Sequence, residues 1–384
     1  MAKMTYGKAS CNDYDDMVDL ANYVFSHSYD KTDFPTLLPK LYKKDCYVAE
    51  HHYIVKEDGK IKAIVGSYPM TFNVCGETLK VGTVGIVSVH PYSRYKGYMK
   101  LLMNEAMEEM SINGTDLGCL GGQRQRYEHY GFTPCGTMID FICDSDNIRY
   151  RFRGNFPSGI IFKEVISNED EGLDLISNMH SRKKAYIERS KDKLFEIMTS
   201  WNHRIFGIWI KEKMIGYLSV SHDLGVIHEI CIADTLLLAE SVGAFLKQFG
   251  LNRVKIKILS VDADKIVQFS GLAEDVEIIN VCNINVLNYA KVMKAFLKLK
   301  NSALPDGQMT VKILNKCNIT ISVTNNRADV WETNEKPDYT LTHLEAMQLF
   351  FSPVSAFSMG VMTGNSFAES LFPIPLFVER NDQA

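Results

Sequence analysis

Residues 87–102 read VSVHPYSRYKGYMKLL, and this stretch decides the fold of the first part of the chain. The apolar run from Val84 to Val89 predicts a strand, which His90 and Pro91 end. Apolar residues then recur at the spacing of one helix face, at Met99, Leu102, Met103, Ala106 and Met110. The stretch therefore predicts a strand, a short turn and a helix.

The predicted turn is basic and contains a glycine, in the order Arg94-Tyr95-Lys96-Gly97-Tyr98. The first backbone N–H groups of a helix have no partner inside the helix, and the helix dipole adds partial positive charge there. Because Gly97 has no Cβ, a phosphate group can approach the backbone closely. We expect a diphosphate cradle at this turn. The alternative is an ordinary strand–turn–helix whose charges are solvated.

A second informative segment, GGQRQRYEHYGF, covers residues 121–132 and follows a short predicted strand, Leu117 to Leu120. The two segments in this order resemble the GCN5-related N-acetyltransferase (GNAT) family. In that family an Arg/Gln-x-x-Gly-x-Gly/Ala turn follows the central strand, and Tyr-Glu-x-x-Gly-Phe lies downstream. Arg94 and Gly97 match the first pattern, Met99 stands at its third small position, and residues 127–132 match the second.

The resemblance implies acetyl-coenzyme A as the cosubstrate. It implies a cofactor site formed by Val87, Ser88, Val89, Arg94, Tyr95, Lys96, Gly97, Tyr98 and Met99. It also implies that the phenol of Tyr127 protonates the departing thiolate, which is general acid catalysis. The alternative for Tyr127 is a packing tyrosine whose hydroxyl binds a backbone carbonyl. A backbone N–H near Val89 is a candidate for stabilising the oxyanion.

Composition limits the other possibilities. The chain has 384 residues, 46% of them hydrophobic and 23% charged, with a net charge of −4, so we expect two or three globular domains. This charge gives no reason to expect nucleic acid or an anionic membrane as a partner. No apolar run reaches the length of a membrane span, and the N-terminus lacks the apolar region of a signal peptide, so we expect a cytoplasmic protein.

The pattern of cysteine and histidine residues predicts no metal site. Nine cysteines are scattered without a CxxC pair, and the histidines form no HExxH motif. Most of the cysteines lie in apolar, strand-like runs, as expected for buried, reduced thiols.

The element pattern divides the chain into three stretches, 1–150, 151–285 and 286–384. In the first, Tyr53–Lys56 and Lys60–Val65 flank the turn Glu57-Asp58-Gly59, and Pro134–Cys143 is predicted as the last strand. The second repeats this order with a strand, Val226–Ile232, and a helix, Leu236–Phe249. The third has a helix over 286–299, three alternating strands and a capping box at Thr342–Glu345.

The second stretch differs at the junction where the first has its cradle. Its residues are Ala233-Asp234-Thr235, without glycine or a basic side chain, and an acid there repels a diphosphate. We therefore predict a second GNAT-like domain that has lost the cofactor. An unrelated α/β domain is the alternative.

The three-part order resembles the enhanced intracellular survival (Eis) acetyltransferase family over the whole chain. The predicted fold class is α/β and α+β. It consists of two tandem GNAT-like domains, each a mixed β-sheet with flanking helices, and a C-terminal α+β domain like a sterol carrier protein. The resemblance also implies a homo-oligomer, a hexamer, and a terminal carboxylate on Ala384 that enters the first active site. A surface tail is the alternative for Ala384, although the apolar run 370–378 favours packing.

Two functions follow from these observations. The first is an N-acetyltransferase that moves an acetyl group from acetyl-coenzyme A to a primary amine of a small cationic acceptor, which is aminoglycoside-like, polyamine-like or lysine. The second is a non-catalytic protein that binds or senses coenzyme A or a lipid. Intact Arg94, Gly97 and Tyr127 favour the first.

Overall fold

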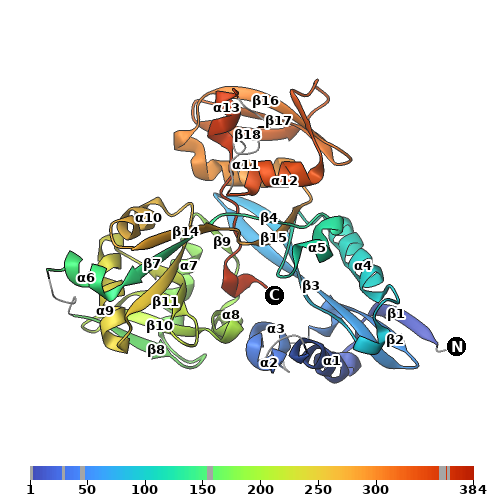
Figure 1. The fold of residues 1–384 in the computed structure, drawn as a ribbon, viewed down its shortest axis with the longest axis horizontal. Coiled ribbons are helices and arrows are strands. Elements are labelled where there is room, and N and C mark those ends of the chain that lie inside the picture. Colours follow the sequence, from blue (N-terminus) through green and yellow to red (C-terminus); the bar gives the residue numbers. More distant parts are fainter. Residues whose placement is uncertain (1–2, 28–30, 44–47, 154–158, 354–359, 361–363) are drawn as a thin grey trace.

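The computed structural model describes the chain except for residues 1–2, 28–30, 44–47, 154–158, 354–359 and 361–363. Within the described residues the strands form three sheets. The first two sheets lie side by side with their helices, and the third lies against both of them (Figure 1). The predicted class of mixed α/β and α+β layers is confirmed.

The first sheet has eight strands in the described chain, in the order β1-β2-β3-β4-β5-β15-β6, with β9 paired to β3. Among its described strands, only β4 and β5 pair in parallel, and the helix between them, α4 (Tyr98–Ile112), forms their crossover. The strands are β1 (Met4–Lys8), β2 (His52–Glu57), β3 (Lys60–Val74), β4 (Glu77–Val89), β5 (Leu117–Leu120), β6 (Thr133–Cys135), β9 (Ala185–Ile187) and β15 (Cys282–Val286).

The hairpin between β2 and β3 forms at the predicted turn. Glu57 pairs with Lys60, and Asp58 and Gly59 have φ values of 49° and 80°. A two-residue turn with positive φ at both central residues has a backbone twist that matches the right-handed twist of the flanking strands. The two faces of β3 are covered by different helices. Ile64 lies in one core cluster with α1 (Tyr14–Ser26), and Val65 lies in another with α4.

The second sheet has seven described strands, in the order β14-β7-β13-β12-β11-β10-β8. Its parallel pair is β12 with β13, joined through α9, in the same arrangement as β4, α4 and β5 of the first sheet. The elements are β7 (Met138–Asp144), β8 (Ile160–Val165), β10 (Arg204–Ile210), β11 (Lys213–Val220), β12 (Val226–Ile232), β13 (Arg253–Leu259), β14 (Asp275–Ile279), α6 (Ser145–Arg151), α7 (Gly172–Ser181), α8 (Leu194–Thr199), α9 (Leu238–Phe249) and α10 (Ala263–Ser270).

The prediction of one strand over Pro134–Cys143 is wrong. The segment forms two strands in two different sheets, β6 in the first and β7 in the second. The chain changes sheets at Gly136, whose φ is +76° and whose Cβ would lie 2.8 Å from the carbonyl oxygen of Leu376. After β14 in the second sheet, the chain returns to the first sheet, where β15 lies between β5 and β6. The first two sheets are therefore linked by exchanged strands.

The third sheet has four described strands in the order β18-β17-β16-β19. Its strands are β16 (Gly307–Ile313), β17 (Cys317–Thr324), β18 (Arg327–Glu332) and β19 (Tyr339–Leu341), and its helices are α11 (Tyr289–Leu297), α12 (His343–Phe351) and α13 (Ser366–Leu371). The predicted capping box is confirmed, because the Thr342 hydroxyl accepts from the backbone of Glu345 and the Glu345 carboxylate accepts from that of Thr342. Likeness of this part to sterol carrier proteins stays a prediction.

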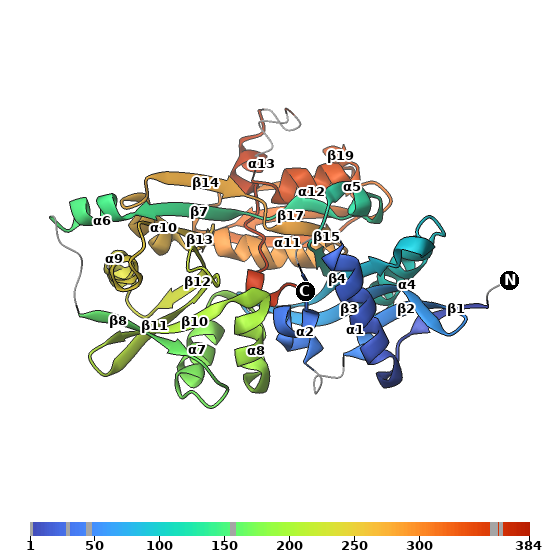
Figure 2. The same ribbon diagram turned by 60° about the horizontal axis from the view of Figure 1, so that its bottom comes forward.

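The last residues of the chain leave the third layer and run between the first two. Figures 1 and 2 both place the C-terminus in the middle of the molecule, near α8 and the two short helices α2 (Phe34–Leu37) and α3 (Pro39–Tyr42). The prediction that the apolar run 370–378 packs is confirmed, because Leu371, Phe372, Ile374 and Leu376 to Val378 are buried.

Among the described helices, none combines the length and the apolar character that crossing a lipid bilayer requires.

Candidate active site

The turn between β4 and α4 has the backbone geometry expected of an anion cradle. Gly97 is the N-cap residue of α4 with φ +81° and ψ +7°, and Tyr95 also has a positive φ of 66°. No atom lies within 4 Å of the position that a Cβ on Gly97 would take. Backbone hydrogen bonds run from Arg94 to Pro91 and from Leu101 to Gly97. Over this fully described turn, none starts from the amides of residues 95–100. Several main-chain donors therefore remain for an anion.

The side chains of this turn divide into two groups. Arg94 and Tyr95 are exposed, whereas Lys96 and the buried Tyr98 both bind Glu57 at the end of β2. The Lys96 ammonium lies 2.6 Å from the Glu57 carboxylate. The hydrogen bonds from Lys96 and Tyr98 hold the pKa of Glu57 below its usual value. Glu57 was not predicted as part of this site, because the hairpin that brings it here is distant in sequence.

Strands β4 and β5 separate beside the turn. Their last parallel pair is Val84 with Leu120, while β4 continues from Gly85 to Val89 with no partner on that side in the described chain. The register with β3 also shifts here, and Ile86 has a positive φ of 40°. A bulge next to a strand end bends the strand and leaves main-chain groups unpaired. The result is a gap beside β4 at the predicted cofactor strand.

The predicted strand residues alternate between the two faces of the sheet. Val87 and Val89 pack against the α4 cluster, and Met99 is half-buried at its edge. Ser88 is 1% exposed, and its hydroxyl has no hydrogen-bond partner within the described structure. A buried hydroxyl without a partner is uncommon in native proteins.

Tyr127 ends α5 (Arg124–Tyr127) and is buried in the same cluster as Val84, Leu120 and Tyr98. Its ring lies so close to Gly122 that a Cβ there would be 2.6 Å from the ring. The amide of Asn283 donates to the carbonyl oxygen of Gly122 at 2.8 Å and fixes the loop before the tyrosine. The structure therefore brings the cradle strand, the cradle helix and the predicted acid into one cluster.

Ala384 approaches the same strand from the other side. Its backbone N–H lies 3.4 Å from the Thr83 hydroxyl, and a Cβ on Gly85 would lie 3.1 Å from the Ala384 Cβ. The ring of Tyr68 packs beside both residues. Of the two alternatives for the chain end, the structure thus has the inserted tail and not the surface tail.

Buried charges hold this tail in place. The Arg189 guanidinium is 1% exposed and binds Asp382 through two hydrogen bonds of 2.8 and 2.9 Å. It also pairs with Glu229 of β12 at 3.0 Å and with Glu379 at 3.5 Å. Lys183 adds a second cation on both glutamates. A paired, planar guanidinium is well suited to such a buried network.

Lys40 of the first domain and Trp201 of the second also bind the tail. The Lys40 ammonium donates to the carbonyl oxygens of Asn381 and Gln383 at 2.5 and 2.7 Å. Lys40 is 8% exposed, and this burial lowers its pKa to about 7. The indole of Trp201 donates to the Gln383 carbonyl at 3.2 Å, and Arg380 lies 3.5 Å from the centre of the Trp201 ring. The tail therefore joins the first two domains at the site.

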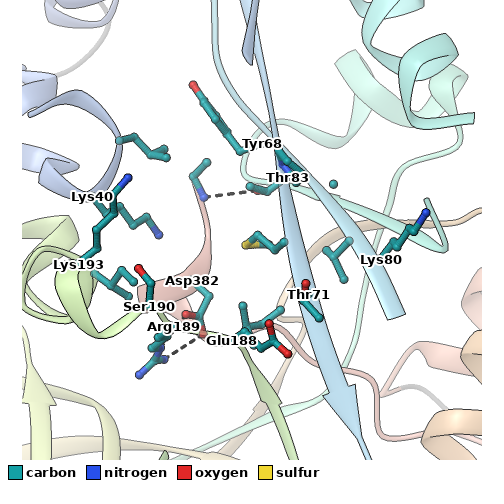
Figure 3. Close-up of a pocket in the computed structure, with 18 of the residues that line it drawn as sticks. Lys40, Tyr68, Thr71, Lys80, Thr83, Glu188, Arg189, Ser190, Lys193 and Asp382 are labelled. Carbon is teal, nitrogen blue, oxygen red and sulfur yellow. Dashed lines mark hydrogen bonds and ion pairs between the residues drawn. The ribbon is translucent and has the colours of Figure 1, made fainter. Parts of the chain in front are cut away.

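A cavity of about 1100 Å³ opens where the tail, the first sheet and the second domain meet. Figure 3 shows Lys40 and Lys193 on its helical side, facing Thr71 and Thr83 of the strands, with Lys80 at the far edge. Ala384 and Tyr68 also line it. None of Lys40, Lys193, Tyr68, Arg189 and Asp382 was predicted, because single residues far apart in sequence leave no local pattern.

His180, Glu229 and Glu379 also offer ligand atoms within 4.8 Å of one another. Both carboxylates are already bound by Lys183 and Arg189. We therefore describe this cluster as an ion-pair network that holds the tail.

At the equivalent junction of the second sheet, the Asp234 carboxylate accepts from the backbone N–H of Leu236 at 3.0 Å. An acid of the chain itself thus occupies the helix start that the first domain leaves open. This contact supports the proposal that the second domain binds no cofactor.

Comparison with known proteins agrees with this geometry. Residues 5–135 match the family model described as "Acetyltransferase (GNAT) domain", so the chain contains a GNAT acetyltransferase domain. A search of curated protein sequences finds no significant match.

Solved structures share the fold over the whole chain. A probable N-acyltransferase from Enterococcus faecalis V583 is 15% identical, with a TM-score of 0.68 over 99% of this chain and 98% of that one. A GCN5-related N-acetyltransferase from Anabaena variabilis is 15% identical, with a TM-score of 0.68 over 99% of both chains. Eis1 from Mycobacterium abscessus is 12% identical, with a TM-score of 0.59 over 89% of this chain and 87% of that one. The fold of the chain is therefore that of Eis-like GNAT proteins.

Proposed function

We propose that this protein is an N-acetyltransferase that uses acetyl-coenzyme A and acetylates a primary amine of a small acceptor. The acceptors implied by the resemblance are aminoglycosides, polyamines and lysine. The observation that carries the proposal is the meeting of three features at β4. These features are the open turn at Gly97, the gap beyond Val84 and the end of the tail at Ala384.

The residues present fit acetyl-coenzyme A. The unpaired amides of residues 95–100, with Arg94, Tyr95 and Lys96 beside them, would hold the diphosphate. The gap along Val87, Ser88 and Val89 would take the extended pantetheine arm. When bound there, acetyl-coenzyme A supplies an activated acetyl thioester.

The chain itself supplies proton transfer and orientation. Amide formation needs a neutral amine and a protonated leaving group. The Tyr127 hydroxyl would hold the proton that the leaving sulfur takes up. The carboxyl group of Ala384, on the other side of β4, would accept the proton of the amine directly or through water. Main-chain N–H groups near Val89 would stabilise negative charge on the carbonyl oxygen.

The test measures thiol release from acetyl-coenzyme A with a panel of amines. We expect turnover with at least one amine, and loss of about 10²-fold or more in kcat for Tyr127→Phe. Tyr130→Phe is the matched control, because Tyr130 lies three residues further along the same segment. Binding of coenzyme A without turnover for every amine would instead indicate the non-catalytic binding protein.

The oligomer and the domain roles are part of the proposal. We propose a cytoplasmic homohexamer in which residues 1–150 bind the cofactor, residues 151–285 form a cofactor-free GNAT-like domain and residues 286–384 form the C-terminal domain. Across these bounds, β7 lies in the sheet of the second domain, and β9 and β15 lie in the sheet of the first. Light scattering that shows a monomer would contradict the hexamer.

A further inference from the structure

The charges that line the cavity at Ala384 distinguish between classes of amine acceptor. The acidic side chains of the lining are Glu109, Glu188 and Asp382. Asp382 is bound on both oxygens by Arg189, and Glu109 lies 2.7 Å from Lys8. Two of the three acids are thus already paired with cations of the chain.

Glu188 is the remaining acid of the described lining. It is exposed, and its carboxylate accepts from the neutral amide of Asn73 at 2.7 Å. Together with the carboxyl group of Ala384, it can attract one ammonium group.

Arg189 is bound within its ion-pair network, but the three lysines of the lining, Lys40, Lys80 and Lys193, are not paired with acids of the described chain. Lys40 and Lys80 donate to backbone carbonyl oxygens, at 2.5 and 2.7 Å for Lys40 and at 2.9 Å for Lys80. Lys193 precedes α8 and is half-buried. In the described part of the chain, none of these three lysines forms an ion pair with a carboxylate.

This arrangement opposes a polycation. Each further ammonium group of a polyamine or an aminoglycoside would have to approach Lys193 or Lys80 without an acid to bind it. Neighbouring cations also lower the pKa of a bound amine. A lower pKa favours the neutral, nucleophilic form, provided that the acceptor carries few positive charges itself.

We propose that the acceptor is an amine that also carries an anionic group, such as a carboxylate, and that Lys193 binds this group. This inference rests on the proposed function, of which it specifies the substrate. The amine end lies toward Ala384 and the anionic end toward the second domain. Among the acceptors implied by the resemblance, free lysine carries a carboxylate beside its amines, and polyamines and aminoglycosides do not.

The test uses two acceptors of matched length, 6-aminohexanoate and 1,5-diaminopentane, which differ in having a carboxylate or an amine at the far end. We expect kcat/KM to be about tenfold higher for 6-aminohexanoate, the effect of one favourable charge contact. Lys193→Glu should reverse this preference. Lys191→Glu is the matched control, because Lys191 lies on the same short helix, pairs with Asp174 and does not line the cavity.

The outcomes separate the two proposals. A preference for 1,5-diaminopentane, or an unchanged preference in Lys193→Glu, overturns the anionic acceptor but leaves the acetyltransferase in place. Absence of thiol release with either amine and with the wider panel overturns the acetyltransferase, and the anionic acceptor with it. Circular dichroism of both variants shows whether they are folded.

Discussion

Thr83 and Ala384 lie 301 residues apart in the sequence, yet the Ala384 backbone N–H is 3.4 Å from the Thr83 hydroxyl. Thr83 belongs to β4, the strand that also leads to the predicted cofactor turn. The tail reaches this strand because Arg189 and Lys40, from two different domains, hold it on both sides. The end of the chain is thus a structural part of the candidate active site.

Moving the carboxyl group of Ala384 should impair catalysis. Addition of one glycine after Ala384 shifts the carboxylate by the length of one residue. We expect kcat to fall at least tenfold, because a general base typically increases the rate about 10²–10⁴-fold. The KM for acetyl-coenzyme A should change little, because the cradle lies on the other side of β4. Ala384→Gly retains the carboxylate and should keep most of the activity. Equal loss in both variants would argue for packing instead of proton transfer.

Substitution of Gly97 by alanine should weaken cofactor binding in addition to its cost in stability. Gly97→Ala strains a backbone with φ +81° and places a methyl group in the cradle. Gly114→Ala imposes similar strain at φ +63° just beyond the other end of α4, also with open space around the Cβ. We expect each variant to lose about 1 kcal/mol of unfolding free energy. Calorimetry should show weaker coenzyme A binding only for Gly97→Ala.

Asp382→Asn should loosen the tail. The variant loses one charged partner of Arg189, a buried guanidinium that would retain Glu229 and Glu379. We expect a loss of about 1–3 kcal/mol in unfolding free energy, together with faster amide exchange in residues 379–384. The control is Asp174→Asn at the exposed pair with Lys191, where we expect a loss of less than about 1 kcal/mol. Unchanged exchange in the tail would show that Arg189 does not hold it.

Lys40 should make stability depend on pH above neutrality. Burial lowers its pKa to about 7 in the folded protein, whereas an unfolded lysine keeps its proton to about pH 10. Between these values the unfolded state binds more protons, so the unfolding free energy rises with pH, by up to roughly 1 kcal/mol per unit from this group. Urea unfolding at pH 7.5 and 9.5 should therefore show a difference between wild type and Lys40→Met that grows with pH.

The control for this measurement is Lys80→Met, at an exposed lysine of the same cavity. A pH-independent difference for Lys40→Met would mean that Lys40 remains protonated throughout the range.

Local elements of the fold could be predicted from sequence. The hairpin at Asp58-Gly59 and the helix after Gly97 both depend on residues within a few positions of one another. The single strand predicted over Pro134–Cys143 was wrong, since apolar content alone does not show that the chain turns at Gly136 into another sheet. The local pattern of apolar residues indicates a strand, but it does not show with which strand that segment pairs.

The candidate site was only partly accessible to the same reasoning. The cradle and Tyr127 belong to short, recognisable segments. Asn283 holds the loop before Tyr127 from a strand 161 residues away, and Arg189 binds Asp382 across 193 residues. Such pairs leave no spacing in the sequence that would identify them.

The sequence by itself determined the strand, the turn at Gly97 and the helix. The spacing of apolar residues and the preference of glycine for positive φ both depend on residues within a few positions of one another. Only the tertiary structure decided where the tail ends, which lysines surround the cavity and which acids are already paired. Those features arise when three sheets pack together, and burial then makes each charge depend on the partner that the fold places beside it.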